Sequence, residues 1–303
     1  MKRSRAMLIS KIKKDKPYYI MFLPVVIFLV IFNYLPMVGL INALYEFTPF
    51  KRKYIGVENF MDLFTGIRAN SFWRAFRNTL TISITNLVLA TVLSVIVALL
   101  LNELVSQRFK KVTQTILYLP HFLSWVVAAS IFTIIFSPVD GLVNNVRGVF
   151  GFDPIYFLAE EKWWQPIYYI LNRWKETGWG TIIYLAAISG INPELYEAST
   201  IDGANRWQQA RHITIPAITT TIMIVFILNL GKVMYVFHSI YALQNPNVLA
   251  VSDVLQTFAF RIGIDQAQYG MGTAISFIAS IVGFTLVLIT NKINKKIRGE
   301  SLL

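Results

Sequence analysis

The chain has 303 residues, of which 55% are hydrophobic and only 15% are charged, and it contains no cysteine. Soluble domains usually carry about 25% charged residues, so this composition argues against a soluble protein. The lack of thiols excludes disulfides and thiolate metal sites. Residues 81–101 include no charged side chain, and about 20 such residues suffice to cross a bilayer. We therefore predict an all-α, polytopic membrane protein.

The net charge of +12 gathers at the two ends of the chain. Basic clusters beside apolar spans face the cytoplasm and attract anionic lipid. We therefore expect cytoplasmic segments at residues 1–19 and 292–303, contact with membrane lipid, and no binding to nucleic acid. The apolar run that follows is too long for a signal peptide and has no evident cleavage site, so it predicts a retained first helix. The clusters comprise Lys2, Arg3, Arg5, Lys11, Lys13, Lys14 and Lys16, and Lys292, Lys295, Lys296 and Arg298.

Six apolar runs predict six transmembrane helices, which puts both termini on the same, cytoplasmic side of the cell membrane. The basic turn after the second run and the turn after the fourth agree with this orientation. The loop after the first run disagrees with this orientation, because six spans place its basic residues outside the cell. A short interfacial helix at residues 71–76 would account for two of them. The six runs are residues 20–44, 78–101, 115–136, 166–189, 217–237 and 272–290, and the dissenting basic residues are Lys51, Arg52, Lys53, Arg68, Arg74 and Arg77.

The fourth run is polar in its middle, at residues 172–180. A charged side chain near the bilayer centre costs at least about 2.5 kcal/mol, so these residues should face protein or water. Arg173 and Glu176 are spaced to pair on one helical face. In one interpretation Trp174, Glu176 and Trp179 line a translocation path, where rings stack on sugars and polar groups bind hydroxyls; in the other, the span starts later and they lie in the outer interface. Asn229 in the fifth span is a further candidate for the path, whereas Lys232 can extend its amine outward.

A polar stretch separates the fourth and fifth runs. Asn192 can cap a helix whose first turn holds Pro193, with Glu194 and Glu197 near the positive end of its dipole. Gly203 can then take the left-handed conformation that ends this helix, before a second short helix at about residues 205–213. The helices leave apolar positions at Leu195, Ala198, Ile201 and Trp207 that require a partner surface.

Motifs for enzyme chemistry are lacking. His121, His212 and His238 stand in no HExxH pattern, so no metal site is expected. No GxSxG elbow and no GxxxxGK[ST] phosphate loop occurs. We assign no catalytic residue and no cofactor to this chain, and any ATP and magnesium would bind to a partner ATPase.

Six residues of the polar stretch match the EAA motif of ABC importer permeases: Glu197, Ala198, Asp202, Gly203, Ala204 and Pro216. The chain departs from the motif at Ser199, Ala210 and Ile215. It resembles the MetI-like superfamily of binding-protein-dependent permeases, with a permease domain at residues 77–291, an EAA loop at 191–216, and a first helix and outer loop at 20–76. Four segments resemble the carbohydrate branch of LplB type: FNYLPMVGL (32–40), YLPHFLSWVV (118–127), GWGTIIYLAAISGINPELYEAS (178–199) and LQNPNV (243–248).

The resemblance implies the MetI-like permease fold and an importer of oligosaccharides in a bacterial plasma membrane. Its other parts would be a second, homologous permease, two ATPases that dock on the EAA loop, and an extracytoplasmic solute-binding protein. An importer permease for a non-sugar solute is the main alternative. A polytopic membrane enzyme would need a cluster of acidic or histidine residues at one membrane face, and a secondary transporter would show two related halves; neither feature is evident in the sequence.

Overall fold

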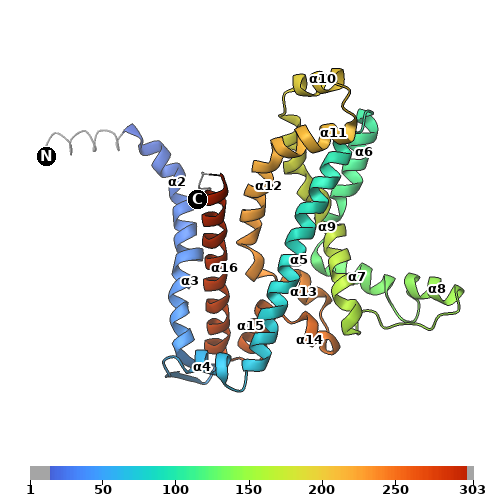
Figure 1. Cartoon of the computed structure of the whole chain (residues 1–303). Coiled ribbons are helices and arrows are strands. Elements are labelled where there is room, and N and C mark those ends of the chain that lie inside the picture. The colour runs from blue at the N-terminus through green and yellow to red at the C-terminus, as the bar shows by residue number, and fades with distance from the viewer. Residues whose placement is uncertain (1–13, 299–303) are drawn as a thin grey trace.

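The computed structural model describes residues 14–298 as a bundle of long helices linked by short ones (Figure 1). The predicted all-α class is confirmed, with the addition of a β-hairpin. The basic residues before Lys14 and residues 299–303 lie outside the described residues. The first half contains α2 (Lys16–Leu29), η1 (Val30–Tyr34), α3 (Leu35–Met37), η2 (Val38–Leu44), β1 (Tyr45–Thr48), β2 (Lys51–Tyr54), α4 (Glu58–Thr65), α5 (Ala69–Asn102), α6 (Gln107–Tyr118), η3 (Leu119–Phe122), α7 (Trp125–Ile135) and α8 (Leu142–Val149).

The second half begins with a long helix whose middle is polar and ends with a long apolar one. It contains α9 (Glu161–Ser189), α10 (Pro193–Ile201), α11 (Arg206–Gln209), η4 (Ala210–Thr214), α12 (Ile215–Leu230), η5 (Val233–Tyr235), α13 (His238–Leu243), η6 (Pro246–Val248), α14 (Leu249–Ser252), α15 (Leu255–Phe260), η7 (Arg261–Asp265) and α16 (Tyr269–Arg298).

Four helical stretches of the described chain are long and apolar enough to span a membrane: Lys16–Leu44, Ala69–Asn102, Arg206–Leu230 and Tyr269–Lys292. A fifth span is present if the bent pair Gln107–Phe122 and Trp125–Ile135 counts as one. Helix α9 is 29 residues long but carries three charged residues in its middle, which lower its hydropathy. With α9 included, the arrangement is compatible with the six predicted spans.

Three boundaries differ from the predicted ones. Residues 71–76 form no separate interfacial helix; they belong to α5, because nothing between Ala69 and Asn102 interrupts the helical hydrogen bonds. The third span is not straight but turns by 101° between η3 and α7, where Pro120 cannot donate a backbone hydrogen bond and Ser124 Oγ caps α7 by accepting from the Val127 N–H. The fifth span ends at Leu230 rather than at Phe237, because the chain turns at Gly231 into η5.

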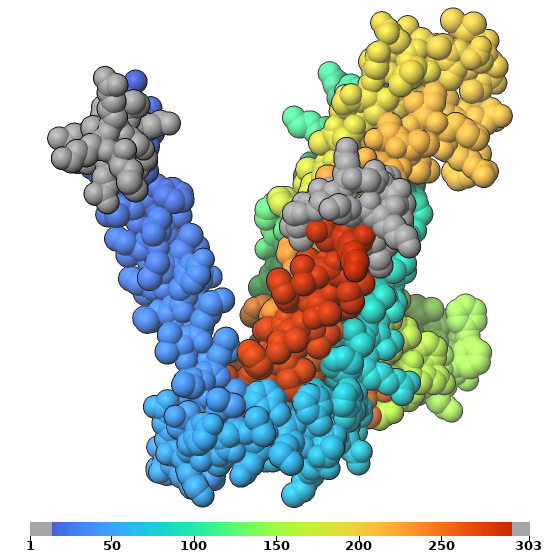
Figure 2. All heavy atoms as spheres, turned by 60° about the vertical axis from the view of Figure 1, so that its left-hand side comes forward, coloured from blue at the N-terminus to red at the C-terminus, as the bar shows by residue number. Residues whose placement is uncertain are grey.

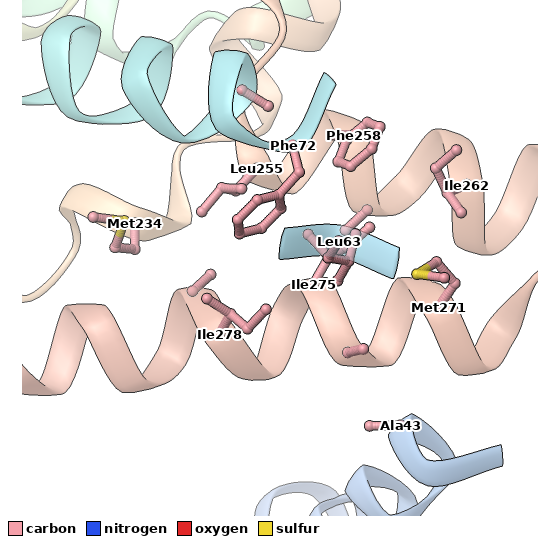
Figure 3. Close-up of a cluster of buried hydrophobic side chains, with 14 of the residues drawn as sticks. Ala43, Leu63, Phe72, Met234, Leu255, Phe258, Ile262, Met271, Ile275 and Ile278 are labelled. Atoms are coloured by element: carbon pink, nitrogen blue, oxygen red, sulfur yellow. The ribbon is translucent and has the colours of Figure 1, made fainter. Parts of the chain in front are cut away.

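A buried apolar cluster joins the hairpin region to the end of the bundle (Figure 3). Phe72 of α5 and Leu63 of α4 are fully buried and lie between α15 and α16 in that view. Leu255 and Ile275 close the cluster from those two helices. Inside a bilayer, close packing rather than exclusion of water stabilises such contacts, so the shape of these side chains fixes how the helices meet.

Helix α9 packs along α5 and crosses α6 at very close range. A Cβ atom on Gly178 would lie 1.9 Å from the backbone oxygen of Leu117 in α6. Only glycine permits this approach, since backbone meets backbone there. Ser94 Oγ of α5 donates to the Thr177 carbonyl, 3.3 Å away. These contacts hold the polar middle of α9 against two neighbouring helices.

Helix α2 stands apart from the bundle. In the space-filling view it is separated from α16 by an open wedge (Figure 2), and none of its residues is buried. Its start and the end of α16 lie at the same end of the molecule as α10, whereas α4 lies at the opposite end (Figure 1). The two ends of the described chain therefore lie at the same end of the molecule.

Candidate functional site

A cavity of about 720 Å³ lies among α5, α9 and α12. The η3 turn and α13 contribute to its wall through His121 and Ser239. Its wall mixes apolar side chains with polar and charged ones. Those of α5 and α9 lie in the middle of long helices, where such groups are costly in a membrane unless they face water or a ligand. The polar and charged wall includes Asn86, Asn172, Arg173, Glu176, Asn229 and Lys232.

Glu176 of α9 is held from two directions. His121 Nδ1 lies 2.9 Å from Glu176 Oε2, and Lys175 Nζ lies 3.3 Å from Glu176 Oε1. Lys175 Nζ also donates to the His121 carbonyl at 2.7 Å. Since Lys175 is buried with only 3% of its surface exposed, its charge requires these partners. The three residues tie the middle of α9 to the turn between α6 and α7.

Trp179 presents an aromatic surface on the same wall. Its ring stacks on the His121 imidazole with centroids 4.4 Å apart and planes 3° from parallel. About half of the side chain is exposed, 45%, and it borders the cavity. The stacking orients the indole and leaves its remaining surface available to a ligand.

The predicted pair of Arg173 and Glu176 is not formed. Arg173 Nη2 donates instead to Asn172 Oδ1 of the same helix, because His121 and Lys175 already occupy the Glu176 carboxylate. Asn172 Nδ2 in turn donates to Tyr168 Oη at 3.2 Å. Helix α9 itself begins at Glu161, so residues 172–180 lie in its middle; their placement in a path rather than in the outer interface stays a prediction.

Of the four residues predicted for the path, three border the cavity: Glu176, Trp179 and Asn229. Trp174 does not. Its ring packs 5.7 Å from that of Phe132 in α7, on another face of α9. The predicted path did not include His121 or any polar residue of α5, and Lys232 was expected to extend its amine outward, yet His121, Lys232 and several polar residues of α5 border the cavity. For α5 a signal existed, since Ser83, Asn86 and Ser94 recur at helical spacing in an otherwise apolar span and all border the cavity.

The loop formed by α10, α11 and η4 lies at the opposite end from α4 (Figure 1), and its local structure follows the predicted signals. Asn192 Oδ1 accepts from the Glu194 N–H at 3.1 Å. Gly203 has φ of +80°, the left-handed conformation that favours glycine. Asn205 and Gln208 then form a reciprocal capping box at the start of α11.

The second helix of this loop is longer than predicted. It does not stop near residue 213 but runs through η4 into α12 without a break, as one stretch from Arg206 to Leu230. Pro216 falls in the first turn of α12, immediately after the π-helical turn η4, where the hydrogen-bond spacing has already changed. The loop therefore continues into a candidate membrane span without a break in the helix.

Side-chain hydrogen bonds hold the two arms of the loop together. Tyr196 Oη and Thr214 Oγ1 lie 2.9 Å apart, and Gln209 Nε2 donates to Ser199 Oγ at 3.0 Å. Ala204 is half-buried. The outer surface, by contrast, is uncovered by the described chain: Leu195, Ile201 and Trp207 are 52%, 88% and 70% exposed, and Glu197, Ala198, Asp202 and Pro216 are exposed as well.

Long apolar helices around a cavity with a partly polar wall, with an exposed helical loop at one end, are typical of a membrane transport subunit. Residues 90–299 match the family described as the inner membrane component of binding-protein-dependent transport systems, and the chain belongs to this family. It is a permease subunit of an ABC importer and not an enzyme; a separate subunit hydrolyses ATP. Within residues 14–298 no group of three or more His, Asp or Glu side chains is placed to hold a metal ion.

Relatives of known role cover almost the whole chain. It is 36% identical to the polygalacturonan/rhamnogalacturonan transport system permease YteP of Bacillus subtilis, over 99% of this chain and 94% of that protein. It is likewise 36% identical to LplB of the same organism, over 97% and 93%. In structure it resembles a bacterial ABC transporter involved in the import of the acidic polysaccharide alginate, with a TM-score of 0.89 and 39% identity over 96% of this chain and 99% of that one.

Proposed function

We propose that this chain forms one half of the transmembrane path of an oligosaccharide importer in a bacterial plasma membrane. The carrying observation is the cavity, in which Glu176 and Trp179 face the same space from the middle of a membrane-spanning helix. Sugars offer hydroxyls to carboxylates and amides and apolar C–H faces to aromatic rings. The import of saccharides by the relatives supports this substrate class over a non-sugar solute.

The exposed loop is the proposed docking site for the ATPase. The loop contains the six motif residues Glu197, Ala198, Asp202, Gly203, Ala204 and Pro216. It also exposes the apolar side chains of Leu195, Ile201 and Trp207, which a partner would cover. Because α11 continues into α12, a displacement of the loop on closure of the ATPase dimer reaches Asn229 at the cavity through one helix. This supplies a path from ATP hydrolysis to alternating access.

The remaining partners follow from the family. A second, homologous permease completes the path, two ATPases bind ATP and magnesium, and a solute-binding protein delivers the substrate outside. A related alginate transporter has been solved in complex with a periplasmic protein bound to an alginate pentasaccharide, which supports the last of these. The end of the molecule that carries α4 and the β-hairpin would then face outward.

This orientation places both termini in the cytoplasm and Lys53 of β2 outside. The chain has no cysteine, so Lys53→Cys creates a unique thiol on an exposed strand. We expect it to react in intact cells with a thiol reagent that cannot cross the membrane. Labelling that occurs only after lysis would reverse the assignment.

The path is tested by uptake of labelled oligosaccharide into proteoliposomes that contain the assembled importer. Trp179→Ala and Glu176→Gln should lower uptake by about ten-fold, as expected when a stacking or charged contact is lost. Trp174→Ala is the matched control, since Trp174 is similarly exposed, 40% against 45%, on the same helix but away from the cavity. If Trp179→Ala and Glu176→Gln take up as much oligosaccharide as the control Trp174→Ala, this cavity is excluded as the path.

A further inference from the structure

Two arginines of this chain, Arg261 and Arg173, have very different partners. Arg261 Nη2 forms an ion pair with the buried carboxylate of Asp253, which Thr257 Oγ1 also contacts at 2.8 Å. Among the described residues Arg173 forms a side-chain hydrogen bond with the neutral Asn172 and no ion pair, and its Nε and Nη1 atoms are buried without a hydrogen-bond partner. Buried guanidinium donors are nearly always paired, so the described chain leaves part of the Arg173 guanidinium unsatisfied and without a counter-charge.

The cavity that Arg173 borders carries an excess of positive charge. Its carboxylate, Glu176, is already engaged by His121 and by the buried amine of Lys175. Lys232 also borders the cavity, and within residues 14–298 no carboxylate lies in ion-pair distance of its amine or of the Arg173 guanidinium. The wall therefore offers two cations whose counter-charge is not supplied by the described chain.

We propose that the substrate is an acidic oligosaccharide and that Arg173 recognises a carboxylate on its sugar rings, with Lys232 as a second cation along the path. A guanidinium and a carboxylate form charge-assisted hydrogen bonds, so the carboxylate would supply the counter-charge that Arg173 lacks among the described residues. Trp179 beside it suits the C–H face of the same ring. This inference rests on the proposed function, since it names the substrate class of that cavity.

Partial burial strengthens the selection at Arg173. Charges that meet away from bulk water interact more strongly than on a surface, so Arg173 should contribute more than the exposed Lys232, and a neutral sugar would leave both cations unpaired. Discrimination of this kind works by rejecting the analogue that lacks the required group. An acidic chain would thus be preferred over a neutral one of the same length and ring size.

The test compares two probes with the same sugar backbone: tetragalacturonate, whose carboxylates are ionised, and its fully methyl-esterified, uncharged form. Each is bound by equilibrium dialysis to the assembled importer in lipid nanodiscs, with maltotetraose as a neutral reference. For the wild type we expect the acid to bind about ten-fold or more tightly than the ester, the gain typical of a charged hydrogen bond. This preference should shrink as salt screens the charges.

The variants assign the preference to a residue. Arg173→Gln should abolish the preference, because the acid then binds more weakly while the ester binds as before. Lys232→Gln should reduce the preference in part, and Arg173→Lys should retain much of it. Arg77→Gln is the control, since Arg77 is exposed on α5 and does not border the cavity. If Arg173→Gln does not assemble, the other two variants test the inference: the preference for the acid should be kept by Arg173→Lys and lowered by Lys232→Gln.

Equal binding of acid and ester to the wild type, or an unchanged preference in Arg173→Gln, would overturn the inference and leave the oligosaccharide importer intact. Failure of all three saccharides to bind would instead count against the proposed function and the inference together. The two failures are therefore distinguishable in one experiment.

Discussion

The exposed loop of α10 and α11 and the cavity beside α9 are both polar regions in an apolar chain, yet they are built in opposite ways. The loop is made by neighbours in sequence: Asn192 caps α10, Gly203 turns the chain, and Asn205 caps α11. The cavity is made by residues far apart, such as His121 and Glu176, which meet only because α6 and α9 are in contact.

The difference has a functional consequence. A surface held by local contacts keeps its shape when the helices around it move, which suits a docking site that must transmit a displacement. A cavity held by contacts between helices changes whenever those helices shift, as alternating access requires. Variants that disturb one kind of contact and spare the other can test this division.

The largest effect is expected from Gly178→Ala, which breaks the contact between helices. The new Cβ would lie 1.9 Å from the Leu117 oxygen, so α9 and α6 must separate and the His121–Glu176 contact is lost with them. We expect a destabilisation of about 3 kcal/mol, at the upper end for overpacking, measured as a lower thermal transition in detergent.

Gly148→Ala provides the control for that variant. Gly148 is also within a helix, α8, but a Cβ there meets no atom within 4 Å. Helix propensity predicts that this change is neutral or stabilises by up to about 1 kcal/mol. If both variants melt at the wild-type temperature, close approach of α9 and α6 does not hold the cavity.

A loss of coupling without a loss of fold is expected from the double variant Glu197→Lys and Gly203→Val. Glu197 is exposed, so its reversal acts on the partner, and a branched side chain at a φ of +80° strains the turn by about 1–3 kcal/mol. Substrate-dependent ATP hydrolysis should disappear in the reconstituted importer while the subunit remains in the membrane. Glu161→Lys, the same reversal at the start of α9, should hydrolyse normally. Wild-type hydrolysis by the double variant would contradict the docking role.

The features that could be predicted from the sequence are the locally determined ones. The cap at Asn192, the turn at Gly203 and the apolar runs were predictable, because local propensity and hydrophobic periodicity determine them. The bend after Pro120 and the extension of the fifth helix through Pro216 were not, because tertiary contacts decide whether a proline ends a helix. Spacing on one helix suggested Arg173 as the partner of Glu176, whereas its partners are the adjacent Lys175 and His121, which comes from a turn 55 residues earlier.

The smallest effect tests whether the loop is locally determined. Asn192→Ala removes the oxygen that accepts from the Glu194 N–H at 3.1 Å, and loss of such a cap costs about 1 kcal/mol. Because Pro193 and Glu194 still favour the first turn, α10 should fray without unfolding. Hydrogen exchange should therefore rise at the first amides of α10 and remain unchanged at those of α9, and uptake should fall only slightly. Faster exchange in α9 as well would show that the loop and the cavity wall unfold as one unit, and that the loop does not keep its shape independently of the helices that move.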